Sequence, residues 1–256
     1  MNKFFFTFDK TKKAQILRKK FLKEYDHYSL KQANIIVVGG GDGFMLHSLK
    51  KFVKHKKFFF GINCGTFGFL MNKNQDINLD KRVKTAKKIV VSPLEIKVKN
   101  KNTSKKLLAI NELSLFRQSK QTVSLQIKLN KRILLKKLIG DGLIVSTPTG
   151  STGYSLSCGG PVISPSCQSL VLTPISPHNL NARPLVISDS TKISISVSGR
   201  EECHLLSIDS KVYTVNNETK ILVEKSNFNI KVANLNNYNF YKTLKEKLLW
   251  GKDKRN

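Results

Sequence analysis

The first ninety residues alternate between short apolar runs and longer stretches with apolar side chains at helical spacing. The apolar runs at 4–8, 34–38 and 58–62 predict strands, the second of them buried on both faces. The segments 10–25 and 43–54 predict amphipathic helices. This strand–helix–strand–helix–strand order is typical of a parallel sheet with helices on its faces.

From about residue 90 the pattern changes to an alternation of period two. The segments 93–99, 107–116, 123–129 and 132–138 each predict a strand, and Asn130-Lys131 is expected to join the last two as a hairpin. Further strands are expected at 143–146, 169–172, 184–187, 192–197, 205–208, 211–215 and 220–223. The tail 241–249 has helical spacing.

These patterns predict an α/β domain over residues 1–90 and a β-rich domain over residues 91–240. Residues 241–256 would form a C-terminal helix and tail that pack on the α/β domain. No internal repeat or low-complexity linker separates them.

The composition is that of a folded, water-soluble chain in a reducing compartment. Of the 256 residues, 40% are hydrophobic, yet no run reaches the roughly 18 apolar residues that cross a bilayer. The apolar run at 4–8 is shorter than the core of a secretory signal, so a first strand is the better interpretation and a cytoplasmic location is expected. The four cysteines form neither a C-x-x-C pair nor a disulfide framework: Cys64, Cys158, Cys167 and Cys203.

The net charge is strongly positive, with 45 basic and 17 acidic residues giving +28. Such a charge can attract nucleic acid, an anionic membrane or an anionic small substrate. The lysines, however, are spread along the whole chain, and the dense stretch 10–23 is interleaved with apolar residues. A general bias towards lysine on solvated faces is the interpretation we favour.

A glycine-rich turn follows the buried strand at 34–38. Its sequence, Gly39-Gly40-Gly41-Asp42-Gly43, would let backbone N–H groups approach a phosphate at the start of the next helix. It lacks the G-x-G-x-x-G spacing, because Phe44 stands where the last glycine would be, and the chain has no G-x-x-x-x-G-K-[ST]. Asp42 is therefore either a helix cap or part of a phosphate site, and the three preceding glycines favour the site.

Two further segments carry polar chemistry. Within residues 141–161 the predicted strand 143–146 leads directly into a run of hydroxyls and glycines, with Tyr154 able to stack on a base. Asn111-Glu112 sets an amide beside a carboxylate, a pair that can bind an adenine edge and ribose hydroxyls. A surface loop rich in Ser, Thr and Gly is the alternative for the long run.

Taken together, these segments resemble the NAD kinase family. The motifs occur in the family's order and span residues 35–188: Gly40-Gly41-Asp42-Gly43, the run from Gly61 to Leu70, Asn111-Glu112, the run from Asp141 to Pro161, and the run from Pro174 to Leu185. The long block from Asp141 is specific, whereas G-G-D-G also occurs in lipid kinases and phosphofructokinases.

The resemblance implies transfer of the terminal phosphate of ATP to the 2′-hydroxyl of the adenosine ribose of NAD. It implies an α/β domain followed by a β-sandwich-like, NAD-binding domain, in a homodimer or homotetramer. Asp42 would be the proton acceptor. The substrates would be held by Gly43, His47, Asn111, Glu112, Asp141, Thr152, Gly153, Tyr154, Ser155, Leu156, Ser157 and Ser176. Mg²⁺ or another divalent cation would arrive with ATP, with no protein residues as dedicated metal ligands.

Four positions bear on how closely the chain follows the family. Phe44 stands where Thr or Asn is usual, Gly153 where Ala is common, and Ile139 where Arg is frequent. His47 matches the Arg or His often found there, although a solvated helix histidine is an equal interpretation.

Two other functions remain as alternatives. A lipid or diacylglycerol kinase shares the G-G-D-G loop but gives no reason for residues 141–161. A non-catalytic nucleotide- or nucleic-acid-binding protein would use the +28 charge but not Asp42. We expect neither a specific nucleic acid nor a membrane as partner.

Overall fold

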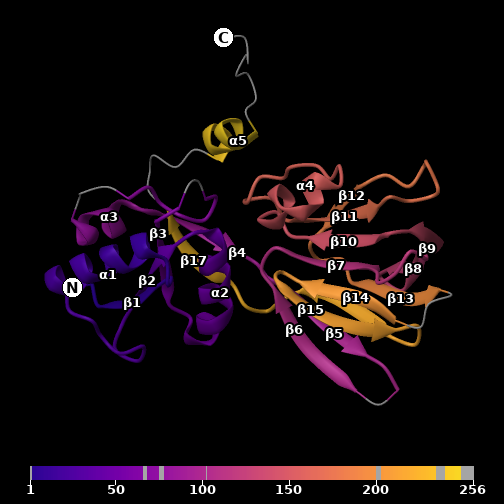
Figure 1. Ribbon diagram of the computed structural model, residues 1–256, viewed down its shortest axis with the longest axis horizontal. Helices are drawn as coiled ribbons and strands as arrows, with labels where there is room; N and C mark the ends of the chain where they lie inside the picture. The colour runs from indigo at the N-terminus through magenta and orange to yellow at the C-terminus, as the bar shows by residue number, and fades with distance from the viewer. Residues whose placement is uncertain are drawn as a thin grey trace, which may run out of the picture. The chain divides into compact units, whose positions relative to one another are not determined.

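The computed structural model describes residues 2–65, 68–74, 78–101, 103–199, 203–234 and 240–248. The chain forms two compact units (Figure 1). The first unit comprises Met1–Val91 and Ile230–Asn256, and the second comprises Ser92–Asn229.

The first unit contains a five-stranded sheet in the order β1-β2-β3-β17-β4. The strands are β1 (Phe4–Phe8), β2 (Ile35–Gly40), β3 (Phe58–Asn63), β17 (Ile230–Asn234) and β4 (Lys87–Val91). Neighbours from β1 to β17 run parallel, and β4 lies antiparallel on the edge. All six residues of β2 are buried, as its unbroken apolar sequence predicts. The predicted α/β architecture with a parallel sheet is confirmed.

Helices lie between these strands and after the last of them. They are α1 (Lys12–Glu24), α2 (Asp42–Phe52), the 3₁₀ turn η1 (Val53–His55), α3 (Leu79–Thr85) and α5 (Phe240–Leu248). Helix α1 buries Ala14, Leu17 and Phe21 on one face, the arrangement that its spacing predicts. The sequence pattern did not identify α3 or β4, which are short and rich in lysine. Of the predicted tail helix 241–249, Leu249 lies outside the described residues.

Strand β17 corrects the predicted domain boundary. Residues 91–240 were expected to form one β-rich domain, but Ile230–Asn234 pairs with β3 and β4 in the first sheet. The pairing covers edges of β3 and β4 that would otherwise present unpaired backbone groups. A five-residue strand carries no signal for which sheet it will join, so this return of the chain could not be read from periodicity.

The second unit is a sandwich of two six-stranded sheets, ordered β12-β11-β10-β7-β14-β15 and β6-β5-β16-β13-β8-β9. All pairings within them are antiparallel. The strands are β5 (Leu94–Lys99), β6 (Ser104–Ala109), β7 (Glu112–Arg117), β8 (Val123–Leu129), β9 (Arg132–Gly140), β10 (Gly142–Ser146), β11 (Ser169–Ile175), β12 (Leu185–Ser188), β13 (Ile193–Gly199), β14 (Cys203–Ile208), β15 (Lys211–Asn216) and β16 (Lys220–Lys225). The β-sandwich-like expectation is therefore confirmed.

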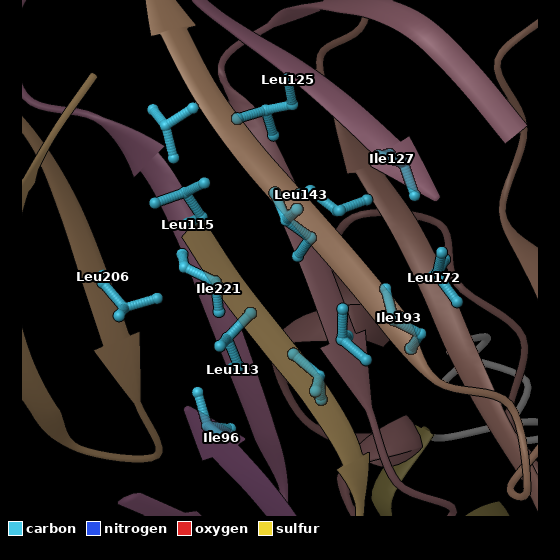
Figure 2. Close-up of a cluster of buried hydrophobic side chains, with 14 of the residues drawn as sticks. Ile96, Leu113, Leu115, Leu125, Ile127, Leu143, Leu172, Ile193, Leu206 and Ile221 are labelled. Carbon is cyan, nitrogen blue, oxygen red and sulfur yellow. The ribbon is translucent and has the colours of Figure 1, made fainter. Parts of the chain in front are cut away.

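One buried cluster joins the two sheets of this sandwich (Figure 2). Leu115 and Leu143 come from the first sheet, and Ile127, Ile193 and Ile221 come from the second. Strands such as β7, β8 and β13 contribute alternate residues to this layer, which is the period-two pattern seen in the sequence.

The segment 107–116 was expected to be one strand, and that expectation is wrong. The chain leaves β6 at Ala109 and enters β7 at Glu112, so it crosses from one sheet to the other at Ile110-Asn111. The predicted hairpin at Asn130-Lys131 is confirmed, with φ of 47° and 70° at these residues.

Candidate active site

The glycine turn lies where β2 ends and α2 begins. An added Cβ at Gly39 would lie 2.2 Å from the Phe8 ring, and one at Gly40 would lie 3.0 Å from the side chain of Phe44. A side chain at Gly39 would therefore displace the Phe8 ring, and one at Gly40 would crowd Phe44. Nothing lies within 4 Å of an added Cβ at Gly41 or Gly43, so the space above the start of α2 is open.

Asp42 is the first residue of α2, and Gly41 is its N-cap. The interpretation of Asp42 as the cap is therefore wrong. Its Oδ2 accepts a hydrogen bond from the Phe69 N–H at 2.8 Å, and its Oδ1 accepts one from the Leu70 N–H at 3.2 Å. The half-buried carboxylate is held at the positive end of a helix dipole, with its orientation set by a second glycine motif.

That second motif is the loop after β3. An added Cβ at Gly68 would lie 2.3 Å from Oδ1 of Asp42, so this loop can approach the carboxylate only with glycine at that position. Thr66 and Phe67 of the same motif lie outside the described residues.

Asn72 anchors this loop, a role that no sequence motif indicated. Its side-chain Nδ2 donates to the carbonyl oxygens of Gly61 at 2.9 Å and Ala233 at 3.0 Å. The anchor joins β3 to β17, so it depends on a strand that the sequence pattern did not identify.

Two other residues proposed for the site lie on α2. Gly43 and His47 are both exposed, and the His47 ring stacks beside Phe44 with ring centroids 6.3 Å apart. Both are accessible to a ligand bound above the start of this helix.

In the second unit, the hydroxyl-rich run follows β10 and contains the 3₁₀ turn η2 (Gly150–Thr152) and the short helix α4 (Tyr154–Ser157). It docks on the Asn111-Glu112 turn. Thr147 donates from its hydroxyl to the Ile110 carbonyl and from its N–H to the Asn111 carbonyl, both at 2.8 Å. Two of the predicted motifs are thus neighbours in space.

The contact between these motifs is close. An added Cβ at Gly150 would lie 2.2 Å from the Asn111 carbonyl oxygen, and one at Gly153 would lie 3.4 Å from Oε2 of Glu112. Asn111 and Glu112 are half-buried, and Oδ1 of Asn111 is buried with no hydrogen-bond partner among the described residues. A buried amide oxygen in that state is suited to accept from a ligand.

The residues of the run itself face different ways. The Tyr154 side chain is 42% exposed and Ser157 is exposed, while Leu156 is half-buried. Ser155 is fully buried, and its hydroxyl bonds that of Thr173 at 2.8 Å, so this side chain supports α4 instead of facing a ligand. Thr152 makes only a long contact, 3.5 Å, to the Thr149 carbonyl.

Burial raises the pKa of Tyr154, and nearby Cys158 and Asp141 raise that pKa further. Tyr154 is therefore a neutral phenol at pH 7, with an exposed ring that can stack on a base.

Asp141 pairs with Arg117, which sequence reasoning missed. The Arg117 Nε lies 2.6 Å from Oδ1 of Asp141, and the Arg117 N–H donates to the Asp141 carbonyl at 2.9 Å. Both side chains are 34% exposed. Arg117 ends β7 and Asp141 precedes β10, and only the pairing of these two strands brings the side chains together.

Ser176 follows β11 with φ of 43° and is exposed. Its carbonyl oxygen would lie 2.8 Å from an added Cβ at Gly140. The residue is therefore beside the segment that carries Asp141.

Comparisons with known proteins identify the family. A chain from Christiangramia forsetii named NAD kinase is 41% identical over 249 residues, which cover 93% of this chain and 84% of that one. The chain belongs to the NAD kinase family. A family model described as the ATP-NAD kinase C-terminal domain matches residues 110–235. An NAD kinase from Fusobacterium nucleatum is 36% identical, over 92% of this chain and 89% of that relative.

Solved structures agree with this membership. A yeast NADH kinase crystallised with NADH matches with a TM-score of 0.76 at 25% identity, covering 88% of this chain and 69% of that one. An Archaeoglobus fulgidus NAD kinase in complex with ATP matches with a TM-score of 0.76 at 24% identity and shows the same fold. The lipid-kinase alternative is not favoured.

No group of three or more His, Cys, Asp or Glu side chains is arranged to hold a metal ion in the part of the chain that the structure describes. Among those residues, too, no helix has the length and apolarity needed to cross a membrane.

Proposed function

We propose that this chain is an NAD kinase, which transfers the terminal phosphate of ATP to the 2′-hydroxyl of the adenosine ribose of NAD and yields NADP and ADP. The observation that carries the proposal is the 41% identity to a named NAD kinase across 93% of the chain. The geometry of Asp42 and of the Asn111-Glu112 turn supports it.

Asp42 is the proposed proton acceptor. Its carboxylate is oriented by the Phe69 and Leu70 N–H groups at 2.8 and 3.2 Å. Little side-chain conformational entropy is therefore lost when the carboxylate takes up a reactive position. In the reaction the 2′-hydroxyl proton passes to Asp42 while the ribose oxygen bonds to the terminal phosphorus. The bond from that phosphorus to the departing ADP oxygen breaks.

The NAD-binding part of the proposal rests on the second unit. Asn111, with its buried and unpartnered Oδ1, and Glu112 would bind the adenosine half. Tyr154 would stack on adenine, and the segment Thr152–Ser157 would line the pocket, with Gly153, Ser155 and Leu156 contributing through backbone and packing. Asp141 and Ser176 would meet the remainder of the dinucleotide.

The donor phosphates would meet the start of α2, where nothing lies within 4 Å of an added Cβ at Gly41 or Gly43. His47, exposed on the same helix, would contact a phosphate. Mg²⁺ or another divalent cation, arriving with ATP, would neutralise phosphate charge.

The assembly is proposed to be a homodimer or homotetramer in the cytoplasm, with no membrane or specific nucleic acid as partner. Size-exclusion chromatography with light scattering measures the subunit number directly.

The activity is tested by incubating the protein with NAD, ATP and Mg²⁺ and reading NADP with an NADP-specific dehydrogenase. NADP that accumulates only when both substrates are present supports the proposal. No NADP, together with phosphorylation of diacylglycerol in detergent micelles, would replace it with the lipid-kinase function.

A further inference from the structure

Asp209 occupies the two-residue turn between β14 and β15, outside every motif that the sequence analysis singled out. Its backbone has φ of 51°, in the left-handed region that Asp and Asn tolerate better than most residues. The side chain is half-buried.

The Asp209 carboxylate accepts three backbone hydrogen bonds from one short segment. Oδ2 accepts from the Ile110 N–H at 3.0 Å, and Oδ1 accepts from the N–H groups of Asn111 at 2.8 Å and Glu112 at 3.2 Å. The Asp209 N–H in turn donates to the Glu112 carbonyl at 2.9 Å. Four hydrogen bonds therefore tie this turn to the Asn111-Glu112 turn.

This is the point where the chain crosses from one sheet of the sandwich to the other. Ile110 and Asn111 lie between β6 and β7, so the strand ladders do not supply partners for their N–H groups. Unsatisfied N–H groups at such a crossing are costly, and a carboxylate is a strong acceptor for several of them at once.

We infer that Asp209 is a positioning residue for NAD. By holding three consecutive N–H groups it sets the direction in which the Asn111 and Glu112 side chains leave the backbone. The Thr147 contacts hold the same segment from the carbonyl side at 2.8 Å. The inference rests on the proposed function, in which Asn111 and Glu112 bind the adenosine half of NAD.

The test is the Asp209→Asn variant. Asn tolerates the same backbone conformation but replaces one acceptor oxygen with an N–H₂ group, which cannot accept. Loss of these hydrogen bonds to the Asn111-Glu112 turn should weaken NAD binding. The KM and the calorimetric Kd for NAD should rise by roughly five- to tenfold. The kcat should stay within about twofold and KM for ATP should not change.

Asp189→Asn is the matched control. Asp189 lies in the same unit and pairs with Lys225, so its replacement removes a carboxylate partner of that lysine and keeps the Asp209 hydrogen bonds in place. We expect this control to leave KM for NAD unchanged. An Asp209→Asn enzyme with unchanged NAD affinity, or with equal losses for NAD and ATP, overturns the inference.

Two measurements keep the inference separate from general stability and from the proposed activity. The effects of Asp209→Asn and Asn111→Ala on NAD affinity should be less than additive, because both act through one side chain; full additivity contradicts the inference. In the unaltered protein the Ile110 and Asn111 amide protons should exchange slowly, and rapid exchange of both also contradicts it. If the unaltered protein makes no NADP yet Asp209→Asn still weakens NAD binding, the proposed activity fails and the positioning role stands.

Discussion

Asp42 shows how one side chain can serve two purposes at the residue scale. It lies at the start of α2 and accepts from the Phe69 and Leu70 N–H groups, so the same carboxylate that we propose as proton acceptor also holds the loop after β3. An Asn at this position retains an acceptor for one of these N–H groups but is a far weaker base. The two purposes are therefore separable by experiment.

Replacing Asp42 with Asn should reduce kcat by about 100-fold or more, the scale of general-base contributions. NAD affinity should be nearly unchanged, because we assign dinucleotide binding to residues of the second unit. Turnover by the coupled dehydrogenase assay and NAD binding by calorimetry measure the two quantities. A fully active Asp42→Asn enzyme would show that the residue only anchors the loop.

Asp141 offers the second residue-scale prediction. Truncation to Ala removes both the proposed acceptor for the far half of the dinucleotide and the partner of Arg117 at 2.6 Å. NAD affinity should fall by about 10- to 150-fold, as expected for loss of a hydrogen bond to a charged group. Adenosine, which carries only the other half, should bind the variant and the unaltered protein alike.

Calorimetry with NAD and adenosine distinguishes this from a structural role for Asp141. A loss shared equally by the two ligands, or a lower melting temperature with no change in either affinity, would remove Asp141 from the binding site.

At the scale of elements, the hairpin turn between β8 and β9 has a strained backbone at Lys131 that glycine would relieve. Asn130 and Lys131 both adopt positive φ, 47° and 70°, and the side chain of Lys131 is exposed. Asn tolerates this region, whereas Lys does not favour it. A two-residue hairpin turn with positive φ at both positions is most stable with the sequence Asn-Gly.

Lys131→Gly should therefore raise the free energy of unfolding by about 0.5–1 kcal/mol without changing turnover. Lys128→Gly is the control, because Lys128 lies inside β8, where glycine weakens a strand by a similar amount. Urea denaturation followed by circular dichroism should move in opposite directions for the two variants. Destabilisation by Lys131→Gly would mean that the lysine side chain contributes packing that outweighs the backbone strain.

At the scale of the whole molecule, the charge of +28 is dispersed over the sequence. Some lysines are held in ion pairs within the sandwich, such as Lys97 and Lys106 with Glu95, where their hydrogen bonds lower the pKa of the Glu95 carboxyl. A dispersed charge of this kind attracts polyanions without recognising them.

Any binding to duplex DNA should accordingly be lost between about 50 and 200 mM salt, the range over which non-specific contacts weaken steeply. Fluorescence anisotropy with two unrelated DNA sequences measures both the salt dependence and the selectivity. Tight binding at about 200 mM salt that differs between the two sequences would revive the nucleic-acid function.

Local pattern was enough to predict most strands and helices, the change of architecture near residue 90 and the family. Strand β2 was predicted from an unbroken apolar run because it is buried on both faces, and α1 was predicted because its apolar residues recur at helical spacing. The glycine turn and the hydroxyl-rich run are contiguous in sequence, so their chemistry was visible without a structure.

The partners of those motifs required the folded chain. Asp209 meets Asn111 across 98 positions, Arg117 meets Asp141 across a strand pairing, and Asn72 meets Ala233 across 161. Periodicity reports only whether a side chain is buried, and it carries no information about which distant segment supplies a hydrogen-bond partner. The return of β17 to the first sheet is of the same kind, because backbone pairing is chosen by the edges available after collapse and not by the five residues of the strand itself.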